Sequence, residues 1–108
     1  LVSTLLADRR HAEALAAVRR LLHHHPDDAD SWHNLVVLLA GAGRLEEAER
    51  AARRFRARRP TDPRAFGDLG IVLARAGRTE EAAAVLREGL RQHPDSEDLR
   101  ENLRRLTE

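Results

Sequence analysis

A repeat of 34 residues runs through the 108-residue chain and constrains its fold more than any other feature. Prolines recur at this interval, and leucines, alanines and glycines keep the same register. The equivalent positions are Pro26, Pro60 and Pro94; Leu1, Leu35, Leu69 and Leu103; Leu5, Leu39 and Leu73; Ala14, Ala48 and Ala82; and Gly43 and Gly77. A period of this length predicts one supersecondary unit per repeat, stacked on its neighbours around a continuous core.

Each repeat is expected to hold two amphipathic helices. Trp32, Leu35 and Leu39 lie on one helical stripe, and a second stripe runs from Leu45 to Phe55. Glycine favours the turn after the first helix, and proline ends the second. The sequence predicts helices over residues 1–8, 11–24, 29–42, 45–58, 63–76, 79–92 and 96–106. The expected fold is an all-α solenoid of about seven helices, and the last of them caps the final repeat.

Composition narrows the classes of function. Nineteen basic residues, all of them arginine, are offset by 18 acidic residues, so the net charge is +1 and gives no global argument for a nucleic-acid or membrane partner. No apolar run approaches the ~20 residues of a membrane helix. The absence of cysteine excludes disulfides, thiolate metal sites and a cysteine nucleophile. Abundant arginine, alanine and leucine without lysine, methionine or tyrosine indicate a GC-rich genome. Because the chain starts at Leu1 with neither a methionine nor a signal peptide, we expect an excised piece of a longer bacterial protein, and we favour the cytoplasm over the periplasm.

The chain carries no convincing catalytic, cofactor or metal motif. The triplet that begins at His11 lacks the cysteine pair of the zinc deaminases. Neighbouring glutamates at 46–47 and 80–81 diverge by about 100° on a helix and form no acid–base pair. The three consecutive histidines at 23–25 also point in different directions, so they do not converge on a metal ion. We therefore expect no catalysis, no cofactor and no metal in this segment.

The pattern resembles that of the tetratricopeptide repeat (TPR) family. One repeat carries the family's residues at Phe66, Leu69, Gly70, Leu73, Ala82, Leu86, Gly89 and Pro94, and the preceding one at Trp32, Leu35, Val36, Leu39, Ala48, Ala52, Phe55 and Pro60. The earlier repeat departs twice, because Val36 replaces the glycine and Ala52 and Phe55 reverse the large-then-small order. Swapped volumes can fill one space, so we expect the fold to be kept.

The resemblance implies a single right-handed superhelical domain. Its parts are a truncated first repeat at 1–28, complete repeats at 29–62 and 63–96, and a capping helix at 97–108. It also implies a concave groove lined by the first helix of each pair, where family members bind peptides or extended segments. The groove candidates are His33, Asn34, Val37, Arg64, Asp68, Ile71, Arg75 and Asn102. Val37 and Ile71 are aliphatic at equivalent positions, which favours a groove floor over scattered surface residues.

One TPR subclass binds a C-terminal carboxylate through basic residues and asparagines at fixed groove positions. Asn34 and Arg64 match two of those positions. Asp68 stands where a basic residue is expected, and Ser3 stands where an asparagine is expected. Because the charge of Asp68 would repel a carboxylate, we predict a ligand with both charges or polar backbone contacts.

Two alternatives remain from the sequence. Arg50, Arg53, Arg54 and Arg58 form a basic patch on the convex side that could dock an acidic protein or nucleic acid. Glu46 and Glu49 stand four residues before Arg50 and Arg53, in the order of exposed ion pairs, which favours a solvated face instead. Because the aromatic residues belong to the core, they leave no base-stacking platform. The second alternative is end-to-end self-association through Leu1, Leu5 and Leu6.

Overall fold

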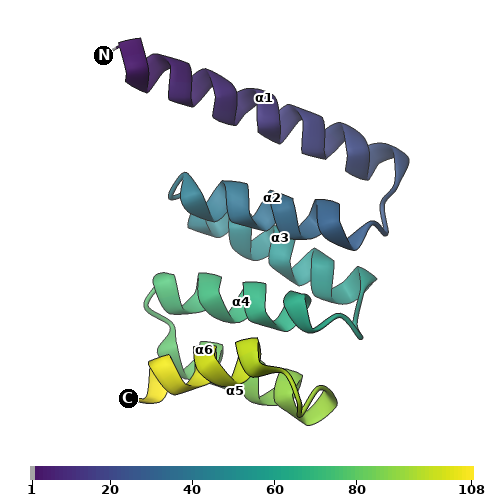
Figure 1. Cartoon of the computed structure of the whole chain (residues 1–108), viewed down its shortest axis with the longest axis vertical. Helices are drawn as coiled ribbons and strands as arrows, with labels where there is room; N and C mark the ends of the chain where they lie inside the picture. Colours follow the sequence, from purple (N-terminus) through teal and green to yellow (C-terminus); the bar gives the residue numbers. More distant parts are fainter. Residues whose placement is uncertain (1) are drawn as a thin grey trace.

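The computed structural model describes the backbone of residues 2–108 and the side chains of residues 8–108, and this part of the chain is all-α. Its helices are α1 (Val2–His24), α2 (Ala29–Gly41), α3 (Leu45–Arg58), α4 (Pro63–Arg75), α5 (Thr79–Gln92) and α6 (Glu97–Thr107). Each helix packs on the next, and the stack proceeds from α1 at one end to α5 and α6 at the other (Figure 1). Helix α4 also packs against both α2 and α6, which makes these three helices the inner row of the solenoid.

The ends of the helices follow the punctuation in the sequence. Asp62 caps α4 by accepting a hydrogen bond from the backbone N–H of Arg64 at 2.9 Å, and Pro63 occupies the first turn. Gly43 and Gly77 adopt φ of 77° and 83°, a left-handed conformation that ends α2 and α4. The five predicted helices after residue 28 are confirmed to within one residue at each end.

The predicted break between helices 1–8 and 11–24 is wrong, because α1 runs without interruption from Val2 to His24 (Figure 1). Arg9 stands one repeat before Gly43, where the turn requires a positive φ. A side chain disfavours that conformation, so the helix continues through the position. The side chains of Leu1, Ser3, Leu5 and Leu6 lie outside the described residues, and the predictions that rest on them stay predictions.

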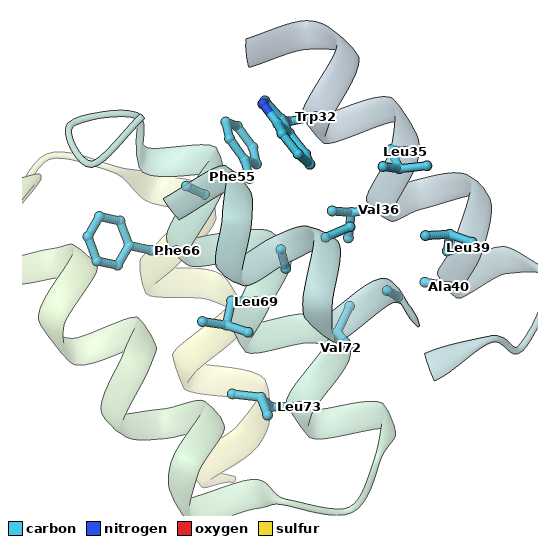
Figure 2. Packing of buried hydrophobic residues seen from close by; sticks show 14 of the residues in the cluster. Trp32, Leu35, Val36, Leu39, Ala40, Phe55, Phe66, Leu69, Val72 and Leu73 are labelled. Carbon is cyan, nitrogen blue, oxygen red and sulfur yellow. The ribbon is translucent and has the colours of Figure 1, made fainter. Parts of the chain in front are cut away.

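The predicted hydrophobic stripes meet in one continuous core. Large side chains of α2, α3 and α4 gather there, among them Trp32, Phe55, Phe66, Leu69 and Leu73 (Figure 2). The indole Nε1–H of Trp32 donates to the carbonyl of Pro26 at 2.7 Å, so the buried ring keeps a hydrogen-bond partner. Because Pro26 begins the connection from α1 to α2, this bond ties that loop to the core.

The two departures from the TPR pattern are accommodated in this core. Val36, Ala52 and Phe55 are all buried, as are the residues that stand at the equivalent places one repeat later, Gly70, Leu86 and Gly89. A smaller residue on one helix is matched in each repeat by a larger one on its neighbour. The predicted preservation of the fold despite swapped volumes is confirmed.

Candidate functional site

A groove of about 360 Å³ lies along the inner row of helices. Its walls come from α2, α4 and α6 together with the residue that caps α6. The lining residues are His33, Pro63, Arg64, Gly67, Asp68, Ile71, Ser96, Asp98, Leu99, Glu101, Asn102 and Arg105. Because these helices repeat at a constant interval, residues from three successive turns of the solenoid face one space.

A hydrogen-bonded pair of side chains between α2 and α4 forms one wall of the groove. Nδ1 of His33 lies 2.8 Å from Oδ2 of Asp68. Asp68 is buried, with only 8% of its surface exposed. Burial raises the pKa of Asp68 above its ordinary value, and the hydrogen bond from His33 offsets part of this effect. Asp68 is therefore not a freely solvated charge: its carboxyl group is buried and bonded to His33.

Arg64 is held at the rim of the groove by two carboxylates. Its guanidinium donates to Asp62 at 3.1 Å and to Asp30 at 2.8 Å. These bonds to Asp62 and Asp30 raise the pKa of Arg64. Burial opposes the ionisation of Asp62, but the hydrogen bonds that it accepts from Arg64 outweigh burial and lower the pKa of Asp62. The positive charge of Arg64 is thus already compensated within the protein.

A smaller apolar pocket of about 240 Å³ adjoins the groove between α4, α5 and α6. Its lining residues are Gly70, Ile71, Ala74, Arg75, Leu86, Asn102, Arg105 and Leu106. Ile71, Asn102 and Arg105 line both spaces, so the groove and the apolar pocket are continuous. Ile71 is 42% exposed at this boundary, which leaves an aliphatic side chain accessible between a polar and an apolar compartment.

The structure brings most of the sequence-predicted groove residues together. His33, Arg64, Asp68, Ile71 and Asn102 line the groove, and Arg75 lines the apolar pocket. Asn34 and Val37 are exposed on α2 but line neither space.

Sequence reasoning missed the apolar pocket. Its walls include Leu86 and Leu106, and the repeat register assigns both to packed stripes. No signal in the sequence separates a leucine that is fully covered from one that covers a pocket wall. That distinction depends on how closely α6 approaches α4, which is a tertiary property.

The predicted basic patch on α3 divides into two parts. Arg53 donates to Glu49 at 3.0 Å and to Glu81 at 2.8 Å, and Arg78 bonds the same two glutamates. These four side chains link α3 to the start of α5. The predicted pairing of Glu49 with Arg53 is confirmed, whereas the predicted pair of Glu46 and Arg50 does not form in the structure. The other three arginines of the patch, Arg50, Arg54 and Arg58, line a separate cleft next to α1.

Two further features bear on function in the part of the chain that the structure describes. There, no three histidine, aspartate or glutamate side chains gather as they would around a metal ion. None of the helices there combines the length and the apolar character that crossing a membrane requires.

The comparisons with known proteins agree with the repeat architecture. The tetratricopeptide repeat family matches the chain over residues 1–63 and again over 34–97. No curated protein matches the sequence.

Solved structures with the same fold cover almost the whole chain at low sequence identity. The TPR domain of Sgt2 from Aspergillus fumigatus superposes with a TM-score of 0.82 at 16% identity, covering 97% of this chain and 71% of that one. The Arabidopsis OM64 TPR domain gives 0.80 at 16% identity over 97% and 87% of the two chains. The second TPR domain of human RPAP3, in complex with the HSP70 peptide SGPTIEEVD, gives 0.80 at 16% identity over 98% and 88%. The family match spans nearly every residue, and the chain belongs to the tetratricopeptide repeat family.

Proposed function

We propose that this chain is a non-catalytic protein-interaction scaffold that binds a peptide or extended segment of another protein in its concave groove. The observation that carries the proposal is the exposed Ile71 between the polar groove and the apolar pocket. Sites that bind peptides combine an apolar recess for a side chain with nearby polar groups that fix the backbone. This arrangement supports recognition of a segment that lies across α2, α4 and α6.

The lining residues indicate the chemistry of the ligand. The apolar pocket suits an aliphatic side chain, because Ala74, Leu86 and Leu106 line it. The amide of Asn102 can both donate to and accept from a peptide backbone at the boundary. The expected ligand therefore places one aliphatic residue beside backbone groups that remain free to hydrogen bond.

The charges in the groove favour a ligand of mixed sign over a terminal carboxylate. The TPR domain of RPAP3 is solved with a peptide that ends in Glu-Glu-Val-Asp, so binding of an acidic C-terminal peptide is the natural comparison for this groove. In this chain, however, Asp68 carries the opposite charge to the one such a ligand needs, and Arg64 is already bound to Asp62 and Asp30. We propose that the terminal carboxylate is not the main anchor here.

A phage-displayed library of random peptides, selected on the intact chain, tests the proposal. Peptides that survive selection should share an aliphatic residue, and their affinity should fall about tenfold or more in Ile71→Glu, because a charge would enter the boundary of the apolar pocket. Leu21→Glu is the matched control, since Leu21 is a 51% exposed aliphatic residue on α1 that lines neither the groove nor the apolar pocket. Equal loss in both variants, or no loss in Ile71→Glu, contradicts binding in the groove.

A further inference from the structure

A second cleft, of about 520 Å³, lies between α1 and α3 on the far side of α2 from the groove. We call it the α1–α3 cleft. Its lining residues are Arg19, Leu22, His23, Pro26, Trp32, Leu35, Leu39, Glu47, Arg50, Ala51, Arg54 and Arg58. Trp32, Leu35 and Leu39 lie on the face of α2 opposite His33 and Val37, so the α1–α3 cleft and the concave groove are separate surfaces.

The rim of the α1–α3 cleft is strongly cationic. Arg19, Arg50, Arg54 and Arg58 line it against a single acidic residue, Glu47. Glu47 already bonds Arg44 at 2.7 Å, in addition to Arg19 at 3.5 Å. The hydrogen bond from Arg44 lowers the pKa of Glu47, which stays ionised but is largely neutralised. The one acid of the rim is therefore outnumbered by the four arginines that line the cleft.

The arginines of α3 differ in how they are compensated. Arg58 pairs with Asp27 at 3.1 Å, an exposed contact that solvent and salt screen. Among the side chains that the structure describes, no carboxylate lies within ion-pair distance of Arg50 or Arg54. These two guanidinium groups therefore form no ion pair with those side chains, although the charge of Arg50 helps to lower the pKa of Glu47.

The equivalent place one repeat later shows that the fold does not require this arrangement. The positions 34 residues after Arg50, Arg54 and Arg58 hold Ala84, Glu88 and Gln92. Helices α3, α4 and α5 therefore pack in succession, as α1, α2 and α3 do, without these three arginines. The cationic rim is a property of one inter-repeat cleft and not of the repeat.

Two further equivalent positions hold arginines that neighbouring side chains engage at the later place. Arg53, which corresponds to Arg19, is bonded by Glu49 and Glu81. Arg56 replaces Leu22, and its guanidinium carbon lies 5.8 Å from the ring centroid of Phe66, so a cation covers the apolar floor. The α1–α3 cleft thus combines one half-buried aliphatic side chain, Leu22, with a rim of four arginines. At the later place Arg56 stands at the position of Leu22, and Arg53 is the only arginine at the equivalent rim positions.

We propose that the α1–α3 cleft binds an acidic, leucine-rich segment of a partner protein. Its carboxylates would pair with Arg50 and Arg54, because guanidinium groups bind carboxylates through two parallel hydrogen bonds. Its aliphatic side chains would cover Leu22, whose equivalent is covered by an arginine one repeat later. This site is independent of the concave groove and would let the chain hold two partner segments at once.

The floor of the α1–α3 cleft favours a peptide over nucleic acid. Base stacking needs an accessible aromatic face. The chain has one tryptophan, two phenylalanines and no tyrosine. Trp32, Phe55 and Phe66 are all buried, and Trp32 is only 7% exposed. Aliphatic side chains with a cationic rim match an acidic amphipathic segment, whose two kinds of group contact the two parts of the cleft.

The test compares three labelled probes by fluorescence anisotropy on the intact chain. They are a peptide composed of glutamate and leucine, a matched peptide with serine in place of leucine, and single-stranded oligothymidylate. The glutamate–leucine peptide should bind the tightest, by about tenfold over the other two. Equal binding of all three, or tighter binding of the oligonucleotide, would overturn the proposal in favour of a nonspecific polyanion surface. Absence of binding by the glutamate–leucine peptide would also overturn it.

Two variants copied from the next repeat locate the binding. Arg50→Ala/Arg54→Glu/Arg58→Gln gives the α1–α3 cleft the residues of the equivalent place, which the fold tolerates there. Its affinity for the glutamate–leucine peptide should fall about tenfold or more. Leu22→Arg keeps every cation and covers the floor, so it should remove the preference for leucine over serine. If either variant binds as the unchanged chain does, the cleft is not the site.

A charge-matched control separates local contacts from the overall field. Arg87→Glu/Arg91→Glu on α5 removes as much positive charge as the triple variant, since each of its substitutions reverses one charge. Its affinity should stay unchanged, and a loss equal to that of the triple variant would overturn the proposal. Sedimentation of the same samples addresses a second copy of the chain as the occupant. A dimer that the triple variant abolishes would replace the acidic peptide as the ligand of the cleft.

Discussion

Gly70 of α4 lies directly against Leu86 of α5, so closely that a Cβ at Gly70 would stand 2.7 Å from Cδ2 of Leu86. One repeat earlier the same two positions hold Val36 and Ala52, both buried. Each helix pair therefore contains one larger and one smaller residue at this contact. The larger one lies on the first helix in the earlier repeat and on the second helix in the later repeat. This relationship explains how a repeat without the family's glycine keeps the same fold.

Exchanging the larger and the smaller residue of the Gly70–Leu86 pair should recover part of the stability that each single substitution loses. Gly70→Val should lower the free energy of unfolding by about 1–3 kcal/mol through overpacking. Leu86→Ala should lower it by about 2–5 kcal/mol through the cavity that it leaves. The double variant should be more stable than the sum of these losses predicts by more than about 1 kcal/mol, as measured by urea denaturation. Additive losses would show that the two positions are not coupled.

Substitution by alanine should lower the stability of the protein at a glycine with positive φ and raise it at a glycine within a helix. Gly77→Ala should destabilise the chain by about 1–2 kcal/mol, because φ of 83° disfavours a side chain. A Cβ there would contact nothing within 4 Å, so this loss reports the backbone alone. Gly41→Ala is the matched control in α2, where a Cβ also meets nothing, and it should stabilise by about 0.5–1 kcal/mol. Thermal unfolding of both variants checks the difference in sign.

Two aspartates at the same groove should titrate on opposite sides of the ordinary value of 3.8. Burial raises the pKa of Asp68, only partly offset by His33, whereas hydrogen bonds from Arg64 outweigh burial and lower the pKa of Asp62. Carbon-detected NMR of the side-chain carboxyl groups should therefore place the Asp68 midpoint above that of Asp62. The reverse order would contradict the buried geometry of the His33–Asp68 pair.

The sign of the Asp68 shift also predicts how stability depends on pH. A carboxyl whose pKa is raised by folding contributes stability that is present below 3.8 and is lost as the pH rises through its folded pKa. Asp68→Asn removes this titration and keeps an acceptor for His33. The stability of Asp68→Asn relative to the unchanged chain should thus increase as the pH rises from about 4, in denaturation curves measured at a series of pH values. A relative stability that falls over this range would contradict the prediction.

Removing the cap of α6 should loosen the wall of the groove. The Ser96 hydroxyl accepts a hydrogen bond from the backbone N–H of Leu99 at 3.3 Å and lines the groove itself. Ser96→Ala should cost about 1 kcal/mol and raise hydrogen exchange at the start of α6. Exchange in α2 should stay unchanged, because α2 and α6 share no direct packing. A uniform rise along the chain would show global destabilisation instead of local opening.

The sequence by itself determined the all-α repeat, the helix ends after residue 28 and the side of each helix that is buried. These properties are local or periodic: a 34-residue register, a left-handed glycine or a capping aspartate acts within a few residues. The same logic failed at Arg9, where the register implies a turn that the residue itself disfavours. Where one residue departs from the repeat, its own conformational preference predicts the local structure better than its position in the repeat does.

Only the tertiary structure decided which of the exposed residues share a surface. The sequence placed Val37 and Ile71 in one column, but the approach of α6 to α4 builds the apolar pocket beside Ile71 alone. It likewise grouped four arginines of α3 that the structure divides between an ion-pair network and the α1–α3 cleft. Periodicity specifies the direction of a side chain from its own helix, whereas a pocket or an ion pair depends on the distance to a neighbouring helix. That distance follows from the packing of side chains in the core.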